Sequence, residues 1–111
     1  MRRLLSLLVA LPLLTSACNK PPIEDCRKAC WNGMKVRFWA QVDKDVAGKT
    51  LEEAAKTRAI KEIEFQQMEL REEDQGFMNC VSQCHSEGTN EAVACMIAAK
   101  TEAKLLVCLD K

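Results

Sequence analysis

The chain has 111 residues, with 16 basic and 16 acidic side chains and a formal net charge of zero at pH 7. This balance argues against a nucleic-acid-binding surface, which shows a strong excess of Lys and Arg. One domain is expected at this length. With no Tyr, three Phe and two Trp, its core must consist mainly of aliphatic and Met side chains, and such small domains often need covalent cross-links.

The N-terminal segment is typical of an export signal. Met1-Arg2-Arg3 gives a positively charged start, an apolar run from Leu4 to Leu14 follows, and small residues precede Cys18. The apolar run is too short to cross a membrane, because a spanning helix needs about 20 apolar residues. We therefore expect residues 1–17 to be a cleaved signal peptide.

The motif Leu14-Thr15-Ser16-Ala17-Cys18 resembles the lipobox of bacterial lipoproteins, with Thr15 where that motif most often has Leu. The resemblance implies cleavage before Cys18, a diacylglycerol thioether on its sulfur and an acyl chain such as palmitate on its amine. Several acyl chains hold a protein on the lipid bilayer permanently, since each buried methylene contributes about 0.8 kcal/mol. The alternative is a secreted protein in which Cys18 is an ordinary half-cystine.

The anchor implies a location in the bacterial cell envelope. Asn19, which is not Asp, favours the outer membrane over the inner membrane. Residues 18–22 would form a lipidated tether, and residues 23–111 a single Cys-rich helical domain. Removal of Arg2 and Arg3 leaves 14 basic and 16 acidic side chains, a net charge of −2.

Helix is the only periodicity that fits the domain. Pro21-Pro22 begin a first helix, whose apolar stripe runs from Ile23 to Val42 and which should end near Ala47 with Gly48 just beyond. Thr50-Leu51-Glu52-Glu53 is a capping box, so a second helix should start at Leu51.

The second helix is expected to continue through Gln75-Gly76 to about Glu87, with Gly88 closing it. This expectation depends on one apolar stripe that covers about a third of its circumference. The stripe consists of Ala55, Ala59, Ile63, Leu70, Phe77, Cys80, Val81 and Cys84.

The opposite side of the second helix carries Leu51, Ala54, Phe65 and Met68. Either the C-terminal helices pack over these residues, or they form an exposed apolar patch that binds a partner. Trp39 of the first helix points partly away from the cysteines and is a candidate interface anchor. Trp39, Phe65 and Met68 are therefore the candidate interaction residues.

Six cysteines remain when Cys18 is assigned to lipid, and an even number in a small exported chain predicts disulfides. Four of them form two C-x-x-x-C pairs, whose spacing places both sulfurs on one helix face. Two such helices packed antiparallel would be joined by Cys26–Cys84 and Cys30–Cys80. This arrangement resembles the twin C-x-x-x-C helical hairpins of small chaperones of the mitochondrial intermembrane space. Fifteen complete pairings are possible, and the sequence alone selects none.

Elimination leaves Cys95 with Cys108. In one unbroken helix these residues would lie roughly 20 Å apart, well beyond the limit of about 7 Å between the Cα atoms of a disulfide. We therefore expect a helix after Thr89-Asn90 to break at Lys100-Thr101-Glu102. Thr101 would cap a last short helix that ends near Leu109.

The expected fold is all-α, a small disulfide-stapled helical hairpin with a short C-terminal helical pair. This fold contains a register conflict. Cys30 lies 18 residues before Gly48 and Cys80 lies 32 residues after it, so two straight helices would miss register by 14 residues, about 21 Å. A kink at Gly76, a displaced turn, a helical excursion at residues 43–60 or a different pairing would resolve it.

One motif suggests a cofactor. The pattern C-x-x-x-C-H at Cys80, Cys84 and His85 resembles a rare variant of the c-type haem attachment site. It would make the two cysteines thioethers and His85 the proximal ligand, with Met34 or Met96 in the sixth position. The competing interpretation is that His85 is a polar residue near a helix C-terminus.

No catalytic motif is present. The chain has no phosphate-binding Gly-rich loop, no H-E-x-x-H and no C-x-x-C of thiol oxidoreductases, and we expect no metal site. The sequence favours a non-enzymatic envelope lipoprotein, an interaction or structural module that contacts the bilayer and another envelope protein. It needs no cofactor beyond the lipid on Cys18. The alternative is a small membrane-tethered c-type cytochrome.

Overall fold

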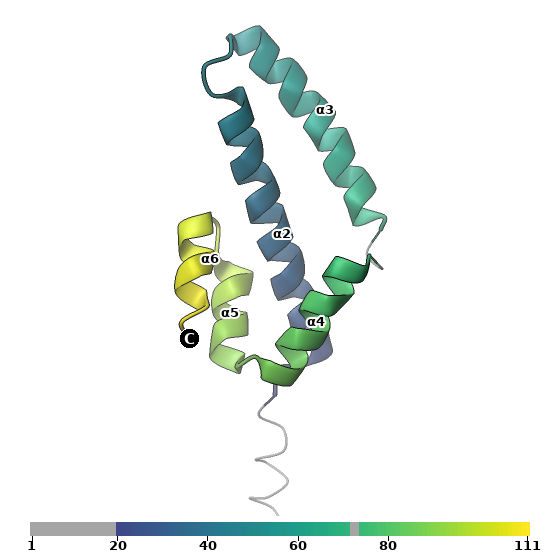
Figure 1. The fold of residues 1–111 in the computed structure, drawn as a ribbon, viewed down its shortest axis with the longest axis vertical. Helices are drawn as coiled ribbons and strands as arrows, with labels where there is room; N and C mark the ends of the chain where they lie inside the picture. The colour runs from purple at the N-terminus through teal and green to yellow at the C-terminus, as the bar shows by residue number, and fades with distance from the viewer. Residues whose placement is uncertain (1–19, 72–73) are drawn as a thin grey trace, which may run out of the picture.

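The computed structural model describes residues 20–71 and 74–111, which fold into five α-helices and no strand. The helices are α2 (Ile23–Val46), α3 (Leu51–Glu69), α4 (Gln75–Glu87), α5 (Asn90–Ala98) and α6 (Glu102–Cys108). In Figure 1, α2 runs through the middle, with α3 on one side and α5 and α6 on the other. The predicted all-α class is confirmed.

The residues at the two ends of helix α2 explain its boundaries. Pro22 precedes it, and Glu24 and Asp25 occupy the first turn, where negative charge is favoured by the helix dipole. The helix ends at Val46, and Gly48 has a φ of 81°, a left-handed conformation that favours glycine. The expected boundaries of the first helix are therefore confirmed.

The expectation of one continuous helix from Leu51 to Glu87 is wrong. Helix α3 ends at Glu69 and α4 begins at Gln75. Figure 1 shows that α3 returns from the turn at an angle to α2, and that α4 then turns back to the N-terminal half of α2. Because α4 starts afresh, its cysteines reach Cys26 and Cys30 without the offset of two straight helices. The break lies just before Gly76, the expected position of a kink.

The break also changes which side of α3 faces the protein. Ala55, Ala59, Ile63 and Leu70, which were expected to continue the buried cysteine stripe, are exposed. On the opposite side, Phe65 packs against Phe38 of α2 and Ala54 and Met68 are half-buried, whereas Leu51, at the start of α3, is 93% exposed. The prediction failed because it assigned the residues of α3 and α4 to faces of one continuous helix. The buried faces of two separate helices need not line up in this way.

Three disulfides join the helices. Cys26–Cys84 and Cys30–Cys80 connect α2 to α4, with Cα–Cα distances of 5.8 and 6.1 Å, and Cys95–Cys108 connects α5 to α6 at 5.5 Å. These are the three pairs expected from the sequence. The disulfide cysteines either belong to one of two buried clusters or pack against one. The first contains Cys26, Ala29, Cys30, Phe77, Val81 and Val93, and the second contains Ala99, Leu105 and Cys108.

The C-terminal helical pair forms as expected but packs elsewhere. The side chain of Thr89 accepts a hydrogen bond from the Ala92 amide at the start of α5, and Thr101 accepts one from the Lys104 amide at the start of α6. Both helices pack on α2. The expectation that they cover Phe65 and Met68 of α3 is therefore wrong, because α2 itself covers that face.

Candidate functional site

Phe65 belongs to the interface between α2 and α3. Its side chain is only 5% exposed. Its ring centroid lies 5.4 Å from those of Trp31 and Phe38 and 5.7 Å from that of Trp39. Met68, one turn further along α3, is half-buried. These contacts correct the idea of an exposed patch at Phe65, because α2 already occupies this face.

Trp39 contacts Phe65 on one side and borders a groove on the other. The residue is half-buried, stacks edge-on against Phe38 at 5.1 Å, and lines a groove beside α2. Its side chain therefore borders an open surface hollow. An aromatic side chain that is rigidly packed on one side and accessible on the other is typical of interface anchors.

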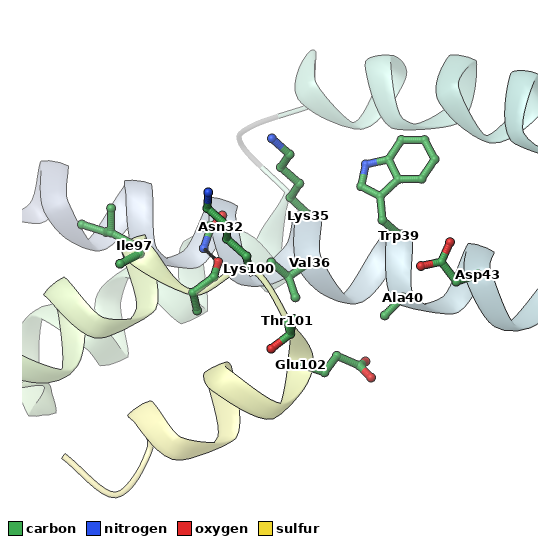
Figure 2. Close-up of a pocket in the computed structure, with 12 residues that line it drawn as sticks. Asn32, Lys35, Val36, Trp39, Ala40, Asp43, Ile97, Lys100, Thr101 and Glu102 are labelled. Carbon is green, nitrogen blue, oxygen red and sulfur yellow. Dashed lines mark hydrogen bonds between the residues drawn. The ribbon is translucent and has the colours of Figure 1, made fainter.

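The groove lies between α2 and the turn that joins α5 to α6, as Figure 2 shows. Its volume is about 570 Å³. Apolar side chains from both elements line it, namely Val36, Trp39, Ala40, Ile97, Ala98 and Ala99. A concave surface of this size with a mainly apolar lining suits a side chain or a short peptide segment of a partner.

The two acidic residues of the groove form ion pairs in the described part of the chain, whereas its two lysines do not. Asp43 forms an ion pair with Arg58, with 2.9 Å between Oδ1 and Nη2. Glu102 forms a second ion pair with Lys44, with 3.9 Å between Oε2 and Nζ. Lys35 and Lys100 have no acidic partner within the described residues. Figure 2 places the two lysines toward one end of the groove and the two acids toward the other. The groove therefore has one end with uncompensated positive charge.

Asn32 holds the groove together. Its amide nitrogen donates hydrogen bonds to the carbonyl oxygens of Met96 and Ala99, both at 2.7 Å. These carbonyls lie at the C-terminal end of α5, where helical carbonyls lack intrahelical partners. The bonds fix the α5–α6 turn against α2 and so set the width of the groove.

The sequence indicated Trp39 but not the other groove residues. Lys35, Lys100 and Ile97 come together only because the α5–α6 turn docks on α2. No local pattern predicts that docking, and Asn32 looks like any polar helix residue in the sequence.

The residues of the haem-like motif have other partners. Cys80 and Cys84 are both joined to α2 by disulfides, and His85 Nδ1 lies 2.8 Å from the Pro21 carbonyl oxygen. Haem attachment would need both sulfurs as thioethers. Met34 and Met96, the expected sixth ligands, pack against the first buried cluster. In the described part of the chain, no group of three or more His, Cys, Asp or Glu side chains is arranged to hold a metal ion.

Cys18 and the predicted signal peptide at residues 1–17 lie outside the described residues. Within the described ranges, no helix combines the length and hydrophobicity that crossing a membrane requires. Comparisons with protein-family models, with curated proteins and with solved structures gave no match.

Proposed function

We propose that this protein is a lipid-anchored lipoprotein of the bacterial cell envelope, whose stapled helical domain binds another envelope protein. It has no enzymatic role in this proposal. The lipid on Cys18 holds the domain at the membrane surface, with the outer membrane favoured. The groove beside α2 receives an exposed segment of the partner.

The cysteine chemistry supports export. All six cysteines of the described residues are in disulfides, and such bonds persist in oxidising compartments such as the periplasm. The lipobox-like motif that ends at Cys18 supports the anchor. Both features favour the bacterial cell envelope as the compartment of the protein.

The groove supports the binding role, and it is the observation that carries this part of the proposal. Its walls are held by the Asn32 hydrogen bonds and, through α5 and α6, by Cys95–Cys108. A groove that is already formed loses little conformational entropy when a partner binds. The unpaired lysines at its end favour an acidic residue beside an apolar one in the partner.

Site-specific photo-crosslinking in the native host tests the binding role. A photoreactive amino acid replaces Ala40 or Ala98 in the groove, and the matched control places it at Ala59, which is exposed on α3. We expect a discrete crosslinked species from the groove positions alone. K35E/K100E should abolish it, whereas K28E, which changes another exposed lysine of α2, should not. Equal crosslinking from Ala59 and the groove would contradict the proposal.

A further inference from the structure

Helix α6 has apolar residues on both its buried and its exposed sides. Leu105 and Cys108 face the core, whereas Leu106, Val107 and Leu109 are 62%, 53% and 64% exposed. Besides the charged residues Glu102 and Lys104, the helix thus has a group of exposed apolar residues at its C-terminal end, and such groups often mark a contact with another apolar surface. The hollow between α4 and the end of α6, about 530 Å³ in volume, extends this apolar surface through Leu109 and Met96.

The C-terminal end of α6 lies at the same end of the domain as the tether. The hydroxyl of Thr89 donates a 3.4 Å hydrogen bond to the Lys111 carbonyl, which places the chain end beside the start of α5. His85, in the last turn of α4, contacts the Pro21 carbonyl just before α2. Figure 1 shows the end of α4, the start of α5 and the C-terminus gathered near the N-terminus of α2.

The length of the tether limits how far this end can stand from a membrane. Pro21 is three residue steps from Cys18, and an extended chain spans at most about 3.6 Å per residue, or about 11 Å in all. A lipid on Cys18 therefore keeps Pro21 within the headgroup region or directly above it. Exposed apolar side chains near Pro21 then meet the lipid–water interface.

We propose that Leu106 and Val107 of α6, with Leu109 directly after the helix, insert into the interface of the membrane that carries the anchor. This inference rests on the lipid anchor of the proposed function. The domain is then held at two places, by the acyl chains and by α6, and the α2–α3 turn projects away from the bilayer. Lys104 is an exposed basic residue of the same helix, and long basic side chains extend their charged ends to lipid headgroups.

Helix α3 supplies an internal control. Ile60 and Ile63 are 59% and 58% exposed, close to the values for Leu106 and Val107. They lie on the opposite side of α2 from α6 and beyond the break from the tethered end (Figure 1). If exposure alone decided membrane contact, both helices would insert. The tether geometry assigns contact to α6 only.

Quenching by brominated phospholipids tests this assignment. The mature lipidated protein is reconstituted into phosphatidylethanolamine–phosphatidylglycerol vesicles, and V107W and I63W are compared with the native background of Trp31 and Trp39. An interfacial helix lies about 5–10 Å into the boundary, so the emission added by V107W should fall by about half, and that added by I63W should not change. The added double substitution L106E/L109E should remove the quenching of V107W.

The outcomes separate the two proposals. Absence of lipid on Cys18 by intact mass overturns the anchor and this inference together. Lipid on Cys18 without quenching of V107W overturns only the contact of α6. Equal quenching of both variants overturns the proposed orientation. A concentration-dependent blue shift of V107W without vesicles would instead assign the face to a second copy of the chain.

Discussion

The two ends of this domain are stabilised in different ways. The cross-linked end, which holds α4, α5, α6 and the N-terminal half of α2, contains the three disulfides of the described residues and both buried clusters. The α2–α3 arm has no disulfide, and Phe65 is the one buried residue of α3. The cross-links therefore reinforce the part of the domain that also contains the buried core. The arm must rely on aromatic packing and surface interactions.

Removal of disulfides should have the largest effect. C26S/C30S/C80S/C84S removes both bridges between α2 and α4, which have sequence separations of 58 and 50 residues, so we expect a loss of at least about 4 kcal/mol of unfolding free energy. Urea unfolding of the unlipidated C18S protein measures this loss, with C95S/C108S as the comparison. The bridge between Cys95 and Cys108 closes only 13 residues, and its removal should cost about 3 kcal/mol. Unchanged stability in both variants would show that the bridges do not hold the domain.

Removal of the Phe65 ring should be the largest change within the arm. F65A leaves a cavity beside Trp31, Phe38 and Trp39, and such core truncations cost about 3–5 kcal/mol. We expect the loss to appear as local opening, with faster amide exchange in α3 and a changed near-ultraviolet signal of the Trp residues. Exchange in α4 should stay slow. The control I63A removes an exposed side chain of the same helix and should change stability by less than about 0.5 kcal/mol.

Asn32 connects the cross-linked end to the groove, and its loss should have an intermediate effect. N32A removes two hydrogen bonds to the α5 carbonyls, at a cost of about 1–3 kcal/mol for partly buried acceptors left without donors. Amide exchange at residues 99–102 should accelerate, while Q67A on the exposed side of α3 should leave it unchanged. If N32A does not affect exchange at this turn, Asn32 does not set the groove.

The Arg58–Asp43 ion pair of the arm should contribute least. Its side chains are about half exposed, and exposed pairs contribute about 0.2–1 kcal/mol. R58A should therefore lower stability only slightly, and the difference from the parent should shrink as salt is added. A loss comparable to that of F65A would mean that electrostatic rather than aromatic contacts hold the arm.

Local signals in the sequence were sufficient for much of the fold. Gly48, Thr50 and Thr101 mark helix ends through their own backbone or side-chain chemistry, and the structure uses all three in that way. The C-x-x-x-C spacing suggested Cys26–Cys84 and Cys30–Cys80 because it places two sulfurs one helical turn apart, and elimination then left Cys95 with Cys108.

The rest depended on tertiary geometry. The break between Glu69 and Gln75 allows the cysteines of α4 to meet Cys26 and Cys30 in register. No single residue of that interval predicts a helix break in the sequence. The exposed side of α3 was misassigned for the same reason. Trp39 was recognisable as a candidate anchor because it lies off the cysteine stripe. The lysines of the groove were not recognisable, because the docked α5–α6 turn brings them to Trp39.

The central claim is that one cysteine carries lipid and the other six are paired. Intact mass measurement and non-reducing peptide mapping of the mature protein, purified from its native membrane, test it most directly. The account predicts an N-terminal acylated Cys18 and the peptides Cys26–Cys84, Cys30–Cys80 and Cys95–Cys108. An unmodified Cys18 behind an uncleaved signal, or free thiols among the six, would contradict it.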